Sequence, residues 1–398
     1  MKKKLTILIS LYLIFTLVGI DKSRANTQDS IRFSLLTCAP GEEIYTLFGH
    51  TAIRYENYTQ NIDVVFNYGL FSFNTPHFIW RFSLGHTDYQ LGATNYERFA
   101  AEYEDEGRQI WQQPLNLSIS EKDELRKQLE TNYLPENRIY RYNFFYDNCA
   151  TRPRIKIEQS VDGQIIYPEN PKDYSVSFRD LLHEYTTNHL WARFGFDLCL
   201  GREADYPITR EQMMFAPIYL MDFFKQAQIK NHDHQNKPLV TETQALIENP
   251  SPPIRSADWF SPLRSALLLF MVVCGITIYE IKKKKAFWAI DLFLFVAAGI
   301  TGSILCFLAC FSQHPAVGEN YLLFVFHPLH LLWAPYLVYC SIKKRKCRYH
   351  QINLIVLTLF IMLFPIIPQR FDLAIVPLAL CLLIRSANHL IRTYKKEQ

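Results

Sequence analysis

One cysteine of this sequence stands where it could act as a nucleophile. Cys149 lies in the stretch 141–152, RYNFFYDNCATR, just before a segment, 150–161, whose apolar spacing predicts a helix. Asp147 or Asn148 could cap that helix, which would put Cys149 in its first turn. There the helix dipole and free N–H groups would lower the pKa of the thiol and could hold a developing oxyanion. A buried structural cysteine is the alternative, and this segment alone does not decide between them.

A histidine that could serve as the base for such a thiol is His50. It follows the turn residue Gly49 and opens the alternating stretch HTAIRY, which predicts a short strand. An imidazole at the start of a strand can project into a cleft and take the proton of a thiol. The next predicted strand, 63–70, carries Asn67, whose amide could orient the ring. A surface or core histidine and a turn residue at a strand end are the respective alternatives.

Several other kinds of catalytic site are disfavoured. The sequence has no His-Glu-x-x-His pattern of a zinc protease, no Gly-x-Ser-x-Gly elbow of a serine hydrolase and no phosphate-binding loop. We therefore expect neither a metal ion nor a cofactor. Within residues 26–258, Asp and Glu outnumber Lys and Arg, which argues against nucleic acid as a partner.

The chain that carries these residues divides into zones of different composition. The net charge of +4 and the mean hydropathy of −0.05 resemble those of a soluble protein. Residues 1–25, however, have the basic start, apolar run and small residues of a secretory signal peptide, with an uncleaved anchor helix as the alternative. We expect residues 26–230 to form an α+β catalytic domain, 231–258 a polar linker and 259–398 a transmembrane domain.

About five helices are predicted in the transmembrane domain. Each apolar run is long enough, or nearly so, to cross a hydrocarbon core about 30 Å thick, and the fourth is the shortest. Basic loops follow the first, third and fifth runs, whereas the other loops carry only Arg370. This alternation places the 26–258 domain and the 312–320 loop outside the cytoplasm. The runs are 263–281, 287–311, 321–342, 352–367 and 371–391.

Three helices are expected in the catalytic domain besides the one after Cys149. Thr94 and Glu97 form a capping-box pattern before 98–105, and Ser120 precedes a second helix over 121–133. The third segment, 210–229, is too apolar for an ordinary surface helix. It predicts either a core helix or a helix resting on the membrane interface.

Of the nine cysteines, only Cys38, Cys149 and Cys199 are expected on the oxidising side of the membrane. None of them forms a Cys-x-x-Cys pair, which disfavours a zinc ribbon or a thioredoxin-like site. Three cysteines allow at most one intrachain bridge. Cys38–Cys199 is the candidate bridge, and free thiols at both positions are the alternative.

A histidine strand that precedes a cysteine helix resembles the circularly permuted form of the papain-like NlpC/P60 fold. Relatives of lecithin-retinol acyltransferase share this order and an Asn-Cys pair such as Asn148-Cys149. Nearly the whole mature chain resembles one family more closely, the Bacteroides-type lipoprotein N-acyltransferases called Lnb. The motifs that carry this resemblance are LLTCAPG around Cys38, LFGHTAIR around His50, FNYG around Asn67, YDNCATR around Cys149 and, in the membrane domain, His314-Pro, Asn320 and His327-Pro-Leu-His330.

The resemblance implies an enzyme of the bacterial inner membrane that acts in lipoprotein maturation. An acyl chain from a phospholipid, or from the lipoprotein's own diacylglyceryl group, would pass through a Cys149 thioester to the α-amino group of the lipidated N-terminal cysteine. His50 would be the base and Asn67 its orienting group, with Asn148 and Arg152 as oxyanion or supporting residues. The polar residues of the membrane domain would contact substrate; they are His314, Asn320, His327 and His330.

Two other functions remain open at this stage. A membrane-tethered cysteine peptidase or amidase of the NlpC/P60 type, acting on cell-wall peptide, would use the same Cys-His pair. A wall hydrolase, however, needs only a tether rather than several membrane spans. A non-catalytic sensor or binding protein is the second alternative.

Overall fold

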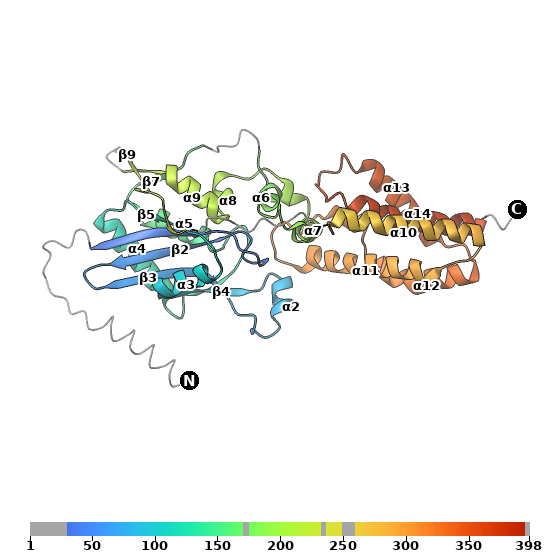
Figure 1. Ribbon diagram of the computed structural model, residues 1–398, viewed down its shortest axis with the longest axis horizontal. Coiled ribbons are helices and arrows are strands. Elements are labelled where there is room, and N and C mark those ends of the chain that lie inside the picture. The colour runs from blue at the N-terminus through green and yellow to red at the C-terminus, as the bar shows by residue number, and fades with distance from the viewer. Residues whose placement is uncertain (1–29, 170–174, 232–235, 249–258, 395–398) are drawn as a thin grey trace.

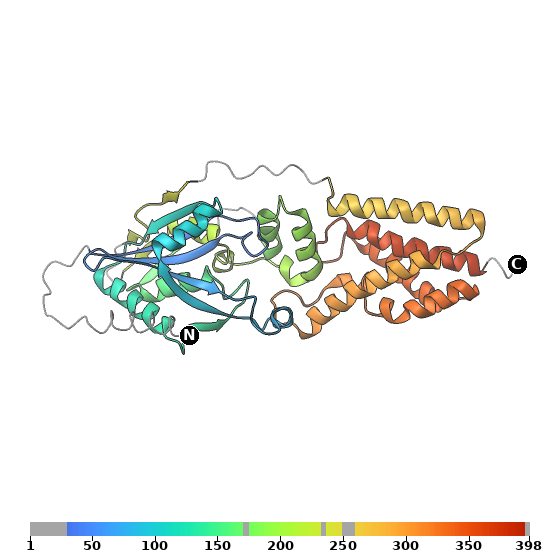
Figure 2. The same ribbon diagram turned by 60° about the horizontal axis from the view of Figure 1, so that its bottom comes forward.

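The computed structural model describes residues 30–169, 175–231, 236–248 and 259–394, so the expected signal peptide lies outside the described residues. The described chain is elongated, with a sheet-rich unit at one end and a helical bundle at the other (Figures 1 and 2). Between them lie α6 (Phe178–Tyr185) and α7 (Leu190–Cys199). This arrangement confirms an α+β domain followed by an apolar helical bundle.

The sheet-rich unit is built on an antiparallel sheet of seven strands in the order β10-β5-β1-β2-β3-β4-β6. Alternating apolar residues explain its two faces. One face packs Leu36, Ala52 and Val65 against Phe99 and Tyr103 of α3 (Tyr96–Asp105). The other face forms the main core with α4 (Ile119–Tyr133), α5 (Thr151–Ser160) and α9 (Pro217–Gln226). The strands are β1 (Ile31–Cys38), β2 (His50–Asn57), β3 (Ile62–Leu70), β4 (Asp88–Asn95), β5 (Ile110–Pro114), β6 (Ile139–Arg141) and β10 (Gln244–Ile247).

A second sheet of three strands is formed by β7 (Gln164–Ile166), β8 (Gln228–Lys230) and β9 (Asn236–Pro238). Both β9 and β10 lie within the segment 231–258 that was expected to be a linker. The structure differs from that expectation because short edge strands are held by distant partners, which their own few residues do not reveal. The sheet-rich unit therefore extends at least to Ile247.

The helices agree with the sequence in place and differ from it at their ends. The structure has α3 (Tyr96–Asp105), α4 (Ile119–Tyr133) and α5 (Thr151–Ser160) where helices were expected. The N-cap of α3 is Asn95, without a side-chain cap, whereas the capping box of α4 joins Ser118 to Glu121. The expected caps, Thr94 and Ser120, were therefore wrong by one and two residues, since neighbouring polar residues compete for the same role.

The apolar segment 210–229 folds as two helices rather than one. They are α8 (Arg210–Met213) and α9 (Pro217–Gln226), and Pro217 starts the second because proline fits the first turn of a helix and not its interior. Met213, Phe215 and Phe224 are fully buried in the main core. This burial decides for the core helix and against a helix resting on the membrane.

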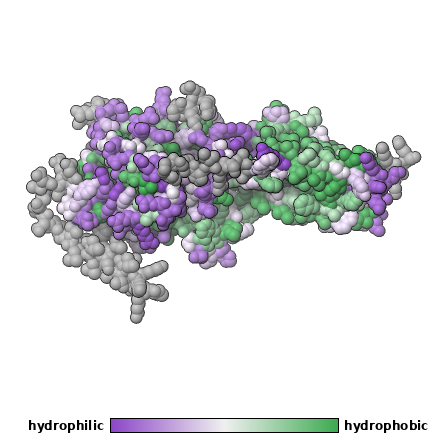
Figure 3. Space-filling view, in the orientation of Figure 1, coloured by the Kyte–Doolittle hydropathy of each residue, from purple (hydrophilic) through white to green (hydrophobic). Residues whose placement is uncertain are grey.

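The bundle contains α10 (Pro262–Lys283), α11 (Trp288–Phe311), the 3-10 turn η2 (Tyr321–Phe324) with α12 (Leu329–Lys343), α13 (Arg348–Leu363) and α14 (Ile375–Tyr394). Four segments are long and apolar enough to cross a membrane, and α13 is shorter. Hydrophobic side chains cover the bundle, whereas hydrophilic ones cover the sheet-rich unit and the far end (Figure 3). Inside, Arg385 pairs with Glu280 at 2.6 Å and also with Asp291.

The two units are joined by specific polar contacts rather than by the chain alone. Nδ2 of Asn320 donates to the carbonyl of Leu198 at 2.7 Å, at the end of α7. Arg370, between α13 and α14, pairs with Asp205 at 2.9 Å and also with Asp180. These contacts, together with buried Gln369 between Asn320 and Leu200, fix the sheet-rich unit on the end of the bundle.

The candidate disulfide is not present, since Cys38 and Cys199 are both free thiols. Cys38 is the last residue of β1 and lies opposite His50 of β2. It is buried against α3, and its thiol is hydrogen-bonded to the side chain of Tyr103. Cys199 ends α7 beside the bundle. The two thiols belong to different parts of the fold, which a count of cysteines does not reveal.

Candidate active site

The site begins where the main sheet opens between β2 and β3. These strands pair only from Ile53 onward, so the first three residues of β2, starting with His50, have no partner on β3 in the described sheet. On its other side, β3 shifts register against β4 between Asn67 and Leu70. A register shift of this kind bends a strand and re-aims its side chains. The result is a gap at the end of the sheet, and α5 approaches it.

His50 and Asn67 face each other across this gap. Nε2 of His50 lies 2.7 Å from Oδ1 of Asn67. An amide oxygen only accepts hydrogen bonds, so Nε2 carries the proton and Nδ1 is the free acceptor. Burial lowers the pKa of His50 to about 4, against the bond to Asn67. The ring is therefore neutral at physiological pH, which is the unprotonated form that a general base requires.

Gly69 separates His50 from Cys149. It has a φ of 96°, a conformation that glycine adopts readily and other residues rarely do. A Cβ on Gly69 would lie 3.5 Å from Cβ of Cys149 and 3.8 Å from Cε1 of His50. These are ordinary van der Waals distances, so Gly69 lies against both the thiol-bearing carbon and the imidazole. Sequence reasoning did not single out Gly69, although an isolated glycine within a strand is a known signal of close approach.

Cys149 precedes α5 by two residues and is held there by its neighbour Asn148. Oδ1 of Asn148 accepts from the N–H groups of Ala150 and Thr151, both at 2.9 Å. Nδ2 of Asn148 donates to the carbonyls of Phe144 and Phe215. The N-cap of α5 is Ala150, without a side-chain cap, so the expectation that Asp147 or Asn148 caps the helix and puts Cys149 in its first turn was wrong. Asn148 instead holds the turn that leads into α5. It has no donor left for an oxyanion and acts as a positioning residue.

The charge state of Cys149 differs from the expectation. Burial raises the pKa of its thiol to about 11, while the backbone N–H groups of Thr51 and of Cys149 itself act in the opposite direction. The expected lowering was wrong because Cys149 stands before the helix, in a site whose burial outweighs two N–H groups. Among the described residues, the thiol and His50 share no hydrogen bond. Both are neutral, and the thiolate has to be formed by proton transfer.

Arg152 is held by partners other than Cys149 and His50. Its guanidinium forms two hydrogen bonds with Asp147, at 2.6 and 2.7 Å, and stacks 3.5 Å over the ring of Tyr140. A guanidinium engaged on a carboxylate and on a ring stabilises the loop before Cys149. Two roles were expected for Arg152. This placement fits the supporting role and does not fit the role of an oxyanion donor.

Comparison with known families covers both units of the chain. A model of the Lnb N-terminal periplasmic domain matches residues 22–182, and a model of the Lnb transmembrane domain matches residues 254–397. The chain belongs to the Lnb family. No curated protein and no solved structure gives a significant match.

Membership in the Lnb family identifies a multi-pass membrane protein with a periplasmic domain, and it places the protein among membrane-bound enzymes of lipoprotein processing. The sheet-rich unit carries the periplasmic match and the bundle carries the transmembrane match. The permuted papain-like relationship stays a prediction.

The four polar residues expected to bind substrate lie apart from Cys149 in this Lnb protein. His314 contacts the carbonyl of Phe82, and Asn320 contacts Leu198 in the joint between the units. In the bundle, His330 bonds to Tyr349 at 2.8 Å and stacks on His327 at 3.8 Å. Their contacts hold structural elements together, and a substrate-binding role for them stays a prediction.

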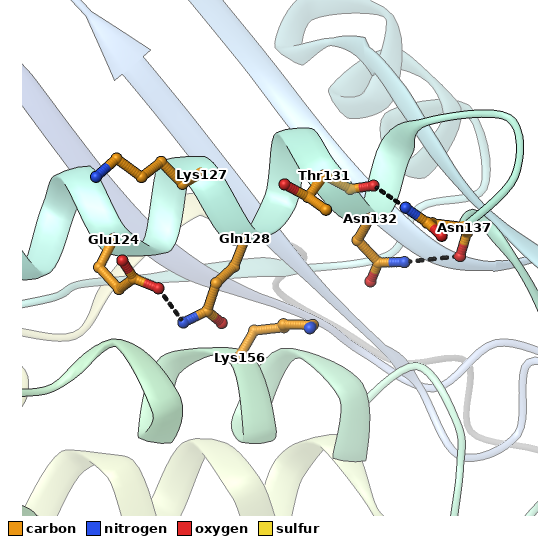
Figure 4. Close-up of a pocket in the computed structure, with 7 residues that line it drawn as sticks. All are labelled: Glu124, Lys127, Gln128, Thr131, Asn132, Asn137 and Lys156. Carbon is orange, nitrogen blue, oxygen red and sulfur yellow. Dashed lines mark hydrogen bonds between the residues drawn. The ribbon is translucent and has the colours of Figure 1, made fainter.

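A surface pocket of about 410 Å³ lies between α4 and α5 and is unrelated to the gap at Gly69. Its side chains are polar and largely bonded to one another or to nearby backbone, as Figure 4 shows for Gln128 with Glu124 and Asn137 with Thr131. The pocket does not pair a nucleophilic side chain with a general base. Among the described residues, no group of three or more His, Cys, Asp or Glu is placed to hold a metal ion.

Proposed function

We propose that this protein is a lipoprotein N-acyltransferase that carries the acyl chain as a thioester on Cys149. The observation that supports the proposal is that Cys149 and His50 both lie against Gly69, with Nε2 of His50 hydrogen-bonded to Asn67. A neutral thiol beside a neutral imidazole is the resting state of a nucleophile that a general base activates.

The first half-reaction would form the thioester. Nδ1 of His50 takes the proton of the Cys149 thiol as the sulfur attacks the carbonyl carbon of a glycerol ester. The N–H groups of Thr51 and Cys149, which act on the sulfur, stabilise its developing negative charge. The carbon–oxygen bond of the ester then breaks, and the leaving glycerol oxygen takes the proton from His50.

The second half-reaction would transfer the chain. The α-amino group of a diacylated lipoprotein attacks the thioester carbonyl and gives a proton to His50. The carbon–sulfur bond breaks, and the Cys149 sulfur takes that proton back as the amide forms. The products are an N-acylated lipoprotein and the free thiol, so no other reactant is needed.

The placement of the site on a membrane bundle supports this reaction over wall-peptide cleavage. Donor and acceptor are both held in the outer leaflet by acyl chains, and the joint at Asn320 and Arg370 holds the site at the periplasmic end of the bundle. A peptidase or amidase acting on wall peptide would use the same Cys-His chemistry and remains the second candidate.

A deletion strain complemented with variants tests the proposal. Mass spectrometry of its lipoproteins should show N-acylation with the wild-type gene and its loss with Cys149→Ala or His50→Ala. Lys127→Ala, in the polar pocket away from Gly69, is the matched control and should restore N-acylation. Unchanged N-acylation in the deletion strain would refute the transferase. Cleavage of wall peptide by the purified protein, dependent on Cys149, would establish the second candidate instead.

A further inference from the structure

A short helix of the periplasmic domain exposes a run of large apolar side chains. This helix, α2 (Phe78–Ser83), buries none of its residues. Ile79 is 80% exposed, Trp80 58% and Phe82 46%. Exposed apolar side chains in such a cluster mark a surface that meets another apolar body. The polar side of α2 is used within the domain, since Arg81 pairs with Asp88 of β4 at 2.8 Å.

The helix lies at the periplasmic end of the bundle. The ring of Trp80 stands 5.1 Å from that of Phe307 in α11. Just after α2, the N–H of Gln313 bonds to the carbonyl of Leu84 at 2.9 Å, and a Cβ on Gly85 would lie 3.0 Å from the backbone of Gln313. Both ribbon views place α2 beside this end of α11 (Figures 1 and 2), and the hydropathy surface there is apolar (Figure 3). The apolar side chains of α2 therefore stand at the membrane surface.

Aromatic rings continue from α2 toward the candidate site. The ring centroid of Phe82 lies 6.1 Å from that of Phe78, and the ring centroid of Phe78 lies 5.1 Å from that of Phe73. Phe73 lies 4.8 Å from Phe71, and the exposed ring of Tyr45 lies 6.2 Å from both. We call the set the aromatic strip; its members are Tyr45, Phe71, Phe73, Phe78, Trp80 and Phe82.

The strip ends near Cys149. Phe71 stacks on Tyr89 at 4.9 Å, and Tyr89 stacks on Tyr142 at 4.1 Å. Phe71 follows Gly69 by two residues in the chain, and a Cβ on Gly69 would lie 3.5 Å from Cβ of Cys149. The strip therefore begins at a membrane helix and ends close to the residue that carries the thiol.

We propose that the aromatic strip binds the acyl chain of a membrane phospholipid and guides its ester bond to Cys149. The inference rests on the proposed function, whose donor it specifies. The occupant follows from the position of the strip, because its first ring touches a membrane-spanning helix and its exposed faces are apolar. Aromatic side chains at the membrane surface favour contact with lipid over contact with a soluble peptide.

A crosslinking experiment tests the path without requiring any reaction. Phosphatidylethanolamine with a photoactivatable group at the end of one acyl chain is incorporated into vesicles with the full-length protein. Crosslinks to Phe71 and Phe73 are expected in the wild type and in Cys149→Ala. Crosslinks confined to the bundle helices and α2 would overturn the proposal, because the chain would then stop at the membrane surface.

A kinetic comparison tests whether the strip serves catalysis. Acylation of Cys149 is measured from phosphatidylethanolamine vesicles and from p-nitrophenyl acetate, a soluble ester with no long chain. The ratio of the two rates should fall about tenfold in Ile79→Asp and in Phe73→Ser. It should stay at the wild-type value in Ile119→Asp, which alters a residue that is 53% exposed at the start of α4. An unchanged ratio in both Ile79→Asp and Phe73→Ser would overturn the proposal, whereas a wild type that reacts with neither ester would refute the acyltransferase itself.

Discussion

The side-chain oxygen of Asn67 lies 2.7 Å from Nε2 of His50, although their strands, β3 and β2, do not pair with each other at these residues. The bond fixes the tautomer of the ring and leaves Nδ1 free to accept a proton. Removing it in Asn67→Ala should lower the rate of acyl transfer about ten- to a hundredfold, because the base is then no longer oriented. Rates on a soluble ester measure this effect.

The conservative change Asn67→Asp separates orientation from charge. A carboxylate still accepts the Nε2 proton, but its negative charge favours the imidazolium and raises the pKa of His50 from about 4. The acidic limb of the rate profile should therefore move to higher pH than in the wild type. Identical pH profiles for Asn67→Asp and the wild type would contradict a role of Asn67 at His50.

Gly69 allows its contacts with Cys149 and His50 to be tested. Gly69→Ala places a methyl group 3.5 Å from Cβ of Cys149 and requires a φ of 96° from a residue that disfavours it. We expect the acylation rate to fall at least about tenfold, with a destabilisation of about 1–2 kcal/mol. Gly195→Ala, in α7 with open space around it, is the matched control for a glycine replacement. Full activity of Gly69→Ala would show that the reaction does not depend on these contacts.

The pH dependence of Cys149 follows from its neutral resting state. Because only the thiolate is alkylated and the pKa of the thiol is about 11, iodoacetamide should react faster by about tenfold per pH unit up to that value. Acyl transfer should instead decline only as pH falls toward 4 and His50 becomes protonated. The Cys149→Ala variant supplies the background. A plateau of alkylation near pH 7 would indicate a thiolate–imidazolium pair instead.

We expect Asn148 to contribute more to the stability of the fold than to the reaction itself. Asn148→Ala leaves two N–H groups and two carbonyls without their side-chain partner, and three of these four bonds are buried. The free energy of unfolding should fall by about 2–4 kcal/mol, measured by thermal or denaturant unfolding in detergent. Asn137→Ala removes an exposed bond to Thr131 and should cost less than about 1 kcal/mol. Equal losses in the two variants would contradict the buried role.

The ion cluster inside the bundle gives a prediction for the membrane domain. Arg385→Met leaves the carboxylates of Glu280 and Asp291 buried without their partner, which should cost about 3–5 kcal/mol. Adding Glu280→Gln and Asp291→Asn should recover most of this loss, because no uncompensated charge then remains. Unfolding in detergent measures both variants. A single variant as stable as the wild type would show that the cluster is solvated.

The sequence predicted what depends on nearest neighbours and on hydropathy. The strand of His50, the helix after Cys149 and the apolar runs of the bundle were all confirmed in place, since each is encoded by a local pattern. The strand β10 and the free state of Cys38 depend on partners far along the chain, which no local pattern carries. Gly69 was visible as an isolated strand glycine, but only the fold shows that its missing side chain faces both Cys149 and His50.

The joint at Asn320 and Arg370 has a consequence for which substrates can react. Because these contacts fix the sheet-rich unit on the bundle, the height of the Cys149 sulfur above the bilayer is a constant of the fold and not of a flexible tether. In the proposed acyl transfer, a lipid ester or a lipoprotein amine would then be selected by how far it stands from the membrane plane. The folded body of the lipoprotein could have any shape, provided that the chain linking it to the lipidated cysteine is long enough to clear the periplasmic domain.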